Sequence, residues 1–177
     1  MAVTATFLRV PDELFQRLLR SPGLARALGA EDSVMDVAED EGLDAQLTGQ
    51  LVECARSARL DLDQAWDGAA RMLSAAKRGW FATDPAGALE AGKHDPQFNV
   101  SFLGVGSVAK IARALERTGP LRTASVRKAL LQAPPYPFDD TTPLEDMLTY
   151  FEPRIVELRD FFQTAKARGE AVVRWIE

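Results

Sequence analysis

Apolar side chains recur along this chain with two different periods, and each period predicts one kind of element. From residue 3 to residue 10 β-branched and apolar residues roughly alternate, which predicts a strand. From residue 98 to residue 103 every second residue is apolar, which predicts another strand with an apolar face. Residues 171–176 (AVVRWI) have the same character, and we expect this last strand to pair with the first one.

Other segments repeat apolar residues three and four positions apart, which is the spacing of one helical face. The most regular of them is 60–74 (LDLDQAWDGAARMLS). Its apolar stripe consists of Leu62, Trp66, Ala69, Ala70 and Leu73. A tryptophan buries a large surface, so we expect Trp66 to fix how neighbouring elements dock. Asp61 is expected to cap this helix, with Gln64 reaching back to form a capping box.

The same spacing predicts six further helices. They are expected at residues 11–19, 24–28, 47–58, 107–118, 123–133 and 144–165. Ser107 is the expected N-cap of the helix that it begins. The last helix contains Pro153, and because proline removes a helical hydrogen bond we expect a kink or a short break there.

The size and composition of the chain predict its fold class. A chain of 177 residues with 46% hydrophobic content can bury the core of one domain. We therefore expect a single α+β domain over residues 1–177, with several helices packed on a small sheet that includes the N- and C-terminal strands. The sequence contains no run of eighteen apolar residues and no signal-peptide pattern at its start, so we expect a cytoplasmic protein that does not insert into membranes.

The net charge of −5 is unevenly distributed along the chain. The first 67 residues hold thirteen acids and six bases, whereas the remaining residues hold thirteen acids and fifteen bases. Binding to duplex nucleic acid needs a clustered basic face, so nucleic acid is not an expected partner. A basic protein is the partner that this charge distribution favours.

The acidic excess is concentrated in residues 31–44, which contain seven acids and no base. These acids are Glu31, Asp32, Asp36, Glu39, Asp40, Glu41 and Asp44. The segment lacks the ligand spacing and the turn glycine of a calcium-binding EF-hand loop. Three interpretations remain open: a solvated loop or helix face, a surface that attracts a basic partner, and a metal site.

Catalytic residue types are scarce. Cys54 is the only cysteine, which excludes an internal disulfide, and it lies on an apolar helical stripe that favours a structural thiol. His94 is the only histidine, and its setting (GKHDP) is typical of a polar loop. We expect no catalytic residue, no cofactor and no metal, and a non-enzymatic function is favoured although an activity is left open.

One further pattern supports an alternative function. The predicted strand at 98–103 is followed by G-x-G-x-x-A and a helix, an order that resembles a dinucleotide-binding turn at Gly104–Ser107. A Rossmann unit would continue to a parallel strand, whereas residues 123–133 predict another helix. The alternative is a small-molecule or nucleotide-binding protein, enzymatic or not. Its pocket would be lined by Asp61, Asp63, Trp66, Trp80, Gly104, Gly106 and Tyr136.

The order of these segments resembles the YfbM-like family of uncharacterised bacterial proteins, a domain-of-unknown-function family. The resemblance is carried by TATFLRV with PDELFQRLL, by LDLDQAWDGAARML, by FLGVGSVAKIARALE, and by YPFDD with the closing EAVVRWIE. The chain departs from the family pattern at residues 79–99, where EAGKHDPQFN replaces a glycine-rich turn. The resemblance implies an α+β domain of YfbM-like type and no particular reaction.

Proteins of this kind are similar to small proteins found near bacterial toxin or defence cassettes, which by analogy implies an immunity role. The leading hypothesis is therefore a non-enzymatic protein-binding module. It would act as an immunity or antitoxin-like protein that neutralises a bacterial toxin through the acidic segment at 31–44.

Overall fold

The computed structural model describes most of the chain. The described residues are 4–21, 24–25, 28, 34–40, 42–62, 64–76, 93–95, 100–118 and 120–176. The strands are β1 (Ala5–Val10), β2 (Arg59–Asp61), β3 (Lys93–Asp95), β4 (Val100–Leu103) and β5 (Ala171–Ile176). The helices are α1 (Asp12–Arg20), α3 (Val34–Asp40), α4 (Ala45–Ser57), α5 (Ala65–Ala75), α6 (Val105–Glu116), α7 (Ala124–Gln132) and α8 (Leu144–Arg168). The predicted α+β class is confirmed.

The five strands form one sheet in the order β2-β1-β5-β4-β3, and every neighbouring pair is antiparallel. β1 and β5 pair over their whole length, from Ala5 opposite Ile176 to Val10 opposite Ala171. The predicted pairing of the first and last strands is therefore confirmed. These two strands occupy the middle of the sheet, so both edges of β5 are paired.

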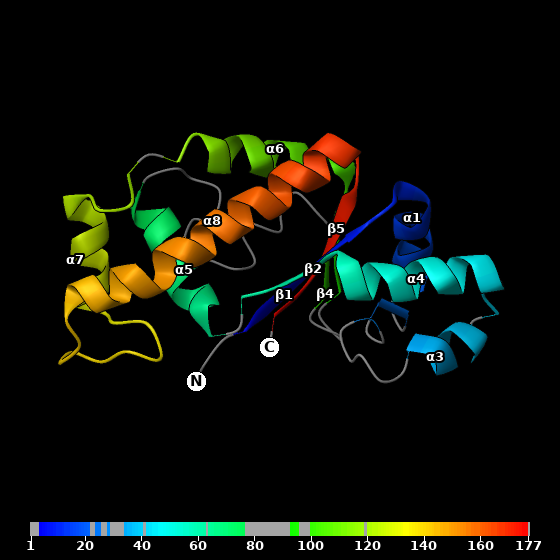
Figure 1. Cartoon of the computed structure of the whole chain (residues 1–177), viewed down its shortest axis with the longest axis horizontal. Helices are drawn as coiled ribbons and strands as arrows, with labels where there is room; N and C mark the ends of the chain where they lie inside the picture. The colour runs from blue at the N-terminus through cyan, green and yellow to red at the C-terminus, as the bar shows by residue number, and fades with distance from the viewer. Residues whose placement is uncertain are drawn as a thin grey trace.

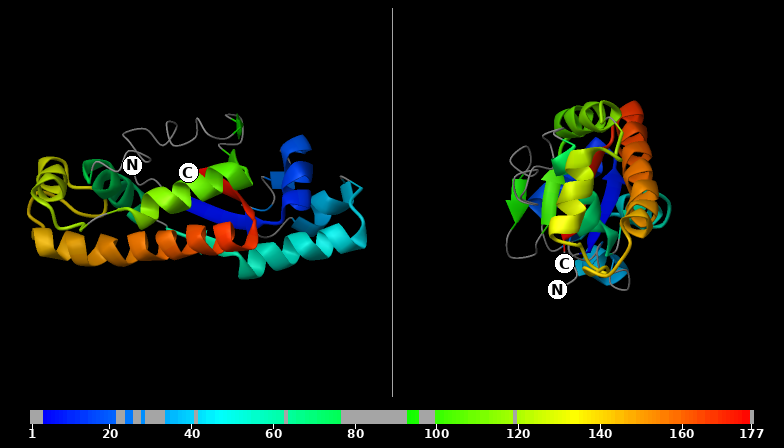
Figure 2. Two further views of the ribbon diagram at one scale, coloured as in Figure 1. Left: turned by 90° about the horizontal axis from the view of Figure 1, so that it is seen from above. Right: turned by 90° about the vertical axis from the view of Figure 1, so that its left-hand side faces the viewer.

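Helices cover both faces of this sheet and produce two apolar cores. On one face α5, α6, α7 and α8 pack over Phe7 and Val172. On the other face α1, α3 and α4 pack over Leu8 and Val173, together with helical residues at 24, 25 and 28. Figures 1 and 2 show these two groups of helices on either side of the strands. Successive strand residues point to opposite faces, so a strand in the middle feeds both cores.

The expectation for Trp66 is confirmed. Its side chain is only 1% exposed and its ring stacks edge-on against Phe7, with the ring centroids 5.5 Å apart. Two residues further along α5, a Cβ at Gly68 would overlap the ring of Phe151 on α8. A glycine there lets α5 and α8 approach closely, so both helices close over the same core.

The predicted start of the Trp66 helix is wrong. Residues 59–61 form β2 instead, with Asp61 opposite Thr6 of β1, and the helix begins at Ala65. Gln64 occupies the N-cap without a side-chain cap hydrogen bond, so the capping box with Asp61 does not form. Pairing with β1 supplies hydrogen-bond partners that a local helical pattern does not reveal.

The start of α6 also differs from the prediction. Gly104 is the N-cap, in an extended conformation, and Ser107 lies within the first turn of the helix. The backbone N–H of Ser107 donates to the carbonyl of Gly104 over 2.8 Å. The expected cap at Ser107 is wrong because the chain turns directly from β4 into the helix.

α8 runs without a break through Pro153, so the expected break is wrong. Pro153 lies on the exposed side, whereas Phe151 and Ile155 on either side are fully buried. Packing of this buried stripe holds the helix together across the missing hydrogen bond.

The strand predicted at 98–103 is confirmed at residues 100–103, whereas β3 differs from its prediction. Val100 and Phe102 do share one core, but Ser101 and Leu103 on the other face are buried as well. The segment around His94, predicted as a polar loop, forms β3 and pairs with β4. Among the residues that the structure describes, no helix is long and apolar enough to cross a membrane.

Candidate functional site

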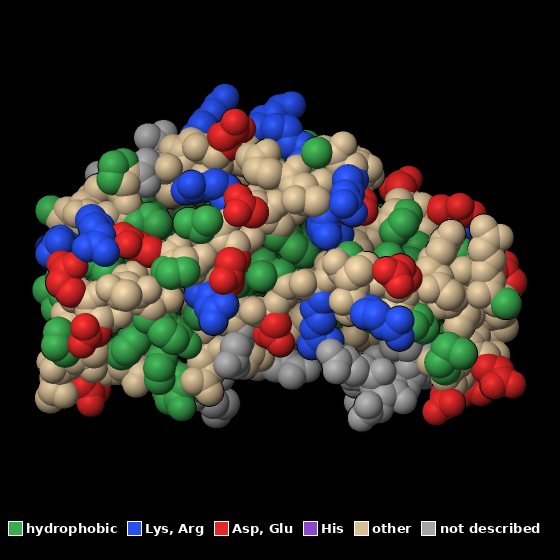
Figure 3. Space-filling view, in the orientation of Figure 1, with side chains coloured by type: hydrophobic (Ala, Val, Ile, Leu, Met, Phe, Trp, Pro, Cys, Tyr) green, Lys and Arg blue, Asp and Glu red, His purple; other side chains and the backbone are tan. Residues whose placement is uncertain are grey.

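The acidic segment of the sequence becomes a short helix that presents one face to solvent. α3 is anchored through Ala38, which is fully buried in the core beside α4. We define the α3 surface as Met35, Asp36, Glu39 and Asp40, all of which are exposed. Figure 3 shows acidic side chains at the lower right of the molecule, where α3 lies. Met35 is 62% exposed and gives this surface an apolar element.

The end of α3 places two of these acids where the helix disfavours them. Gly42 adopts a φ of 65°, its N–H donates to Glu39 O over 3.0 Å, and the N–H of Leu43 donates to Ala38 O over 2.9 Å. This is a glycine-terminated helix end, so Glu39 and Asp40 belong to the last turn. The carboxyl end of a helix carries partial negative charge, which repels carboxylates. No basic residue lies in that turn.

The α3 acids have no partner among the described residues. Asp36, Glu39 and Asp40 make no ion pair and no side-chain hydrogen bond within that part of the chain. Asp44, by contrast, caps α4: its Oδ1 accepts from the N–H of Leu47 over 2.8 Å. Asp44 therefore has a structural role in addition to the predicted one. Three of the predicted partner-binding acids, Glu31, Asp32 and Glu41, lie outside the described residues.

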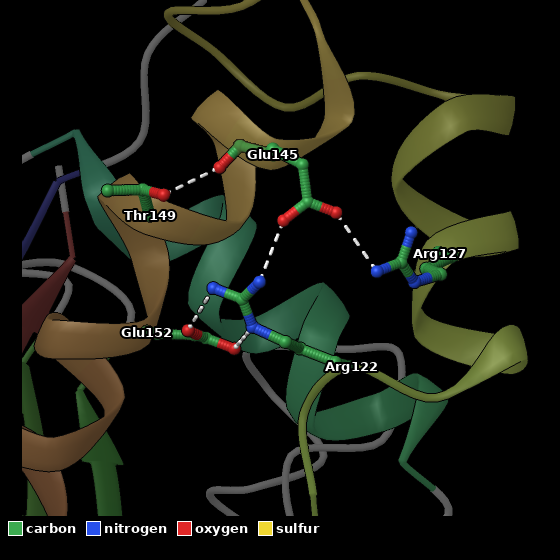
Figure 4. A network of polar contacts seen from close by, with 5 residues as sticks. All are labelled: Arg122, Arg127, Glu145, Thr149 and Glu152. Carbon is green, nitrogen blue, oxygen red and sulfur yellow. Dashed lines mark hydrogen bonds and ion pairs between the residues drawn. The ribbon is translucent and has the colours of Figure 1, made fainter.

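At the junction of α7 and α8, by contrast, Glu145 and Glu152 are both paired with arginines (Figure 4). Arg122 donates to both carboxylate oxygens of Glu152 over 2.9 Å and to Glu145 over 2.7 Å. Arg127 donates to the other oxygen of Glu145 over 2.9 Å. The hydrogen bond to Glu152 and the negative charge of Glu152 raise the pKa of Arg122, and Glu145 adds a smaller effect in the same direction. We call this the Arg122 network, and it ties α8 to the segment that enters α7 and to α7 itself.

The residues proposed to line a small-molecule pocket are not brought together. Trp66 is sealed in a core, and Asp61 lies on β2, which β1 and β5 separate from β4 and the Gly104 turn that follows it. Gly106 is exposed in the first turn of α6, whereas Tyr136 is 48% exposed in the connection from α7 to α8. Figure 1 shows that connection at the end of the molecule away from β4. Asp63 and Trp80 lie outside the described residues.

Two buried polar residues were missed by the sequence analysis. Arg174 and Ser101 are each 1% exposed and stand opposite each other on β5 and β4. Burial lowers the pKa of Arg174 to about 10, and its guanidinium carbon lies 5.7 Å from the Trp66 ring centroid. The only signal in the sequence is an arginine inside an apolar strand. This arginine indicates a buried charge only once both edges of that strand are known to be paired.

The two residues considered for nucleophilic or acid–base chemistry are placed as follows. Cys54 is half-buried on α4, and burial, followed by the charges of Glu170 and Glu53, raises the pKa of its thiol to about 11. The thiol is therefore protonated at neutral pH, which agrees with a structural role. His94 stands opposite Ser101 in the register of β3 and β4. Within the described ranges no three His, Cys, Asp or Glu side chains form a group that could hold a metal ion.

Comparison with known proteins gives one match. A family model described as a domain of unknown function, DUF1877, matches residues 1–175. No curated protein and no solved structure matches the chain. The match covers both cores and all of the sheet except Ile176, the last residue of β5.

Proposed function

The chain belongs to the DUF1877 family, and we propose that it is a non-enzymatic protein-binding domain. Its binding site is the α3 surface, and its partner is a basic protein. The observation that carries the proposal is the set of exposed acids on α3 that the rest of the described chain leaves without ion pairs.

The position of Glu39 and Asp40 in the last turn of α3 supports this proposal. Each carboxylate at that end lowers the stability of the fold by a few tenths of a kcal/mol through the helix dipole. Uncharged residues at these two positions would therefore stabilise the fold. Residues that reduce stability without an internal benefit are typical of binding sites. The fold therefore accounts for Asp44 and Glu145 but not for these two acids.

The chemistry of the surface favours a protein over a small ligand. Protein interfaces combine an apolar centre with a polar rim, and Met35 stands beside the acids in that way. A cluster of like charges on a rigid helix also accelerates the approach of an oppositely charged partner. The net charge of −5 adds to that attraction.

We further propose that the chain is a bacterial, YfbM-like member of the family and acts in the cytoplasm. Its concrete role would be that of an immunity or antitoxin-like protein, which binds a cationic toxin and covers its functional surface. The support is the resemblance of the segments at 4–19, 60–73 and 102–116, together with the charge of the α3 surface.

The test is a kinetic measurement on a cognate basic partner, identified by cross-linking in the source cells and then purified. We would compare wild type with Asp36→Asn/Glu39→Gln/Asp40→Asn by surface plasmon resonance between about 50 and about 500 mM NaCl. Neutralising three steering charges should slow association at low salt about tenfold and flatten its salt dependence.

The matched control is Glu13→Gln/Asp140→Asn/Asp160→Asn, which removes the same charge from exposed positions elsewhere. This control should associate at nearly the wild-type rate, because its changes lie away from the α3 surface. Equal slowing of both variants would mean that net charge alone steers the partner. Unchanged kinetics of the α3 variant would overturn the proposed site.

A further inference from the structure

A basic stripe lies along the outer side of α6. Lys110, Arg113 and Arg117 stand at i, i+3 and i+7, which places them on one side of the helix, and all three are exposed. Figure 3 shows basic side chains at the top of the molecule, over α6. The opposite side of the helix, with Val108 and Ile111, is buried in a core. We call these three residues the α6 stripe, which spans about 10 Å of helix.

Like the α3 acids, the stripe has no partner within its own described chain. None of its three side chains makes an ion pair or a hydrogen bond with other residues that the structure describes. Nearby, Lys166 of α8 pairs with Glu116 over 4.0 Å, and Glu116 stands three residues after Arg113 at the flank of the stripe. Within the described part of the chain, α6 therefore carries three cations without a partner on a well-packed helix.

The α6 stripe and the α3 surface are complementary but cannot meet within one molecule. α6 packs on the face of the sheet that carries Phe7, whereas α3 packs on the face that carries Leu8. The sheet and both cores separate the two charged surfaces. The α3 surface of another copy, unlike that of the same copy, can reach the α6 stripe.

We propose that the α6 stripe binds the α3 surface of a second copy of this chain. Three cations would then face Asp36, Glu39 and Asp40, and Met35 would lie within the contact. The inference rests on the proposed function in one respect, because it takes the α3 surface to be a binding surface. It adds a competitor: a neighbouring copy covers the same acids that the basic partner needs.

The contact joins two different surfaces, and this determines what kind of assembly the copies form. Each copy keeps one unoccupied α3 surface and one unoccupied α6 stripe, so association continues into open chains unless the rotation closes a ring. Exposed ion pairs are weak and are screened by salt. The copies therefore associate at low ionic strength and high concentration and separate as salt is added.

The experiment is analytical ultracentrifugation of the full chain at about 50 and about 500 mM NaCl. The weight-average mass of wild type should rise with protein concentration at low salt and return to that of one chain at high salt. Lys110→Glu/Arg113→Glu/Arg117→Glu should remain monomeric in both conditions, and so should Asp36→Lys/Glu39→Lys/Asp40→Lys. A monomeric wild type at low salt would overturn the inference.

Mixing the two reversed variants provides the decisive arm. The variant with the reversed α6 stripe then has acidic residues on both α6 and α3, and the variant with the reversed α3 surface has basic residues on both. Each can therefore bind the other, and the salt-sensitive association should return. The control Arg20→Glu/Arg56→Glu/Lys128→Glu makes the same change in net charge at other exposed positions and should associate like wild type. Failure of the mixture to associate, or loss of association in the control, would overturn the inference.

The outcome is separable from that of the proposed function. The reversed α6 stripe should bind the cognate basic partner at least as well as wild type, because no second copy covers α3. If wild type is monomeric yet the partner still binds α3, the self-contact is wrong and the proposed function stands. If self-association follows the predicted pattern and no basic partner uses α3, the proposed function is wrong. Salt-sensitive binding of anionic lipid vesicles by the stripe, without self-association, would also overturn the self-contact.

Discussion

The two acidic ends of this molecule differ in how their charges are used. At the junction of α7 and α8, Glu145 and Glu152 are held by Arg122 and Arg127 in a continuous network. On α3, Asp36, Glu39 and Asp40 are exposed and meet no base within the described chain. Composition alone would treat these residues alike. Their surroundings show that one set of acids serves the fold and that the other set needs a different explanation.

Helix polarity makes the same distinction. Glu145 lies in the first turn of α8, where the partial positive charge of the helix end stabilises a carboxylate. Glu39 and Asp40 lie in the last turn of α3, where a carboxylate is disfavoured. The comparison teaches that the position of an acid on its helix is more informative than the number of acids in a segment.

The largest expected effect on stability tests whether packing, rather than charge, stabilises the part of the molecule that carries the Arg122 network. Gly68→Ala should lower the free energy of unfolding by about 3 kcal/mol, because the added Cβ overlaps the Phe151 ring between α5 and α8. Urea unfolding followed by circular dichroism measures the change. Gly49→Ala is the control, because a Cβ there meets nothing within 4 Å. If Gly68→Ala is as stable as this control, the close approach of α5 and α8 is not a constraint.

The second effect concerns α4, which supports the α3 surface, and depends on pH. The pKa of the Cys54 thiol is about 11 in the folded protein against an ordinary value of 9.0, so the folded state holds more protons between those pH values. The free energy of unfolding should therefore fall as pH rises through this window, by about 1 kcal/mol, since solvent screens the half-buried thiol. Urea unfolding at several pH values measures the fall, which Cys54→Ala should reduce. Parallel pH profiles for wild type and variant would contradict the shift.

The third effect separates Asp44 from its acidic neighbours on α3. Asp44→Ala should destabilise the protein by about 1 kcal/mol, because the N–H of Leu47 loses its acceptor. Asp44→Ser keeps an acceptor at the N-cap and should remain close to wild type. Thermal unfolding distinguishes the two variants. Equal stability of all three proteins would mean that the cap contributes nothing.

The smallest effect is the most direct test of the comparison, because it predicts opposite signs. Glu145→Gln should lower the unfolding midpoint by about 1 °C, since it weakens the Arg122 network and the favourable helix-end charge. Asp40→Asn should raise the midpoint by about 1 °C, since it relieves repulsion at the end of α3. Differential scanning calorimetry at low salt resolves such shifts. A decrease for both variants would remove the distinction between the two ends.

Local patterns predicted much of the fold. The burial of Trp66, the pairing of the first and last strands, and the helices that became α1, α4 and α7 all follow from periodicity and end signals. Each of these features depends on residues close in sequence or on strongly apolar strands. The immunity role and the basic partner stay predictions.

Features that depend on distant parts of the chain were not predicted. Asp61 reads as a helix cap until β1 is known to pair with it, and His94 reads as a loop until β4 is placed beside it. The burial of Arg174 follows only once both faces of the sheet are known to be covered. The α3 acids lack ion partners among the described residues because no base from a distant part of that chain lies beside them. A local sequence pattern cannot predict this.

The position of β5 has a consequence for how the molecule is made. Of the five strands, β5 is the last to leave the ribosome, yet it joins the β1–β2 pair to the β4–β3 pair. In the folded order of strands, the β1–β2 pair and the β4–β3 pair share no ladder without residues 171–176. Proteolytic removal of this segment would therefore split the domain through its middle rather than trim its edge.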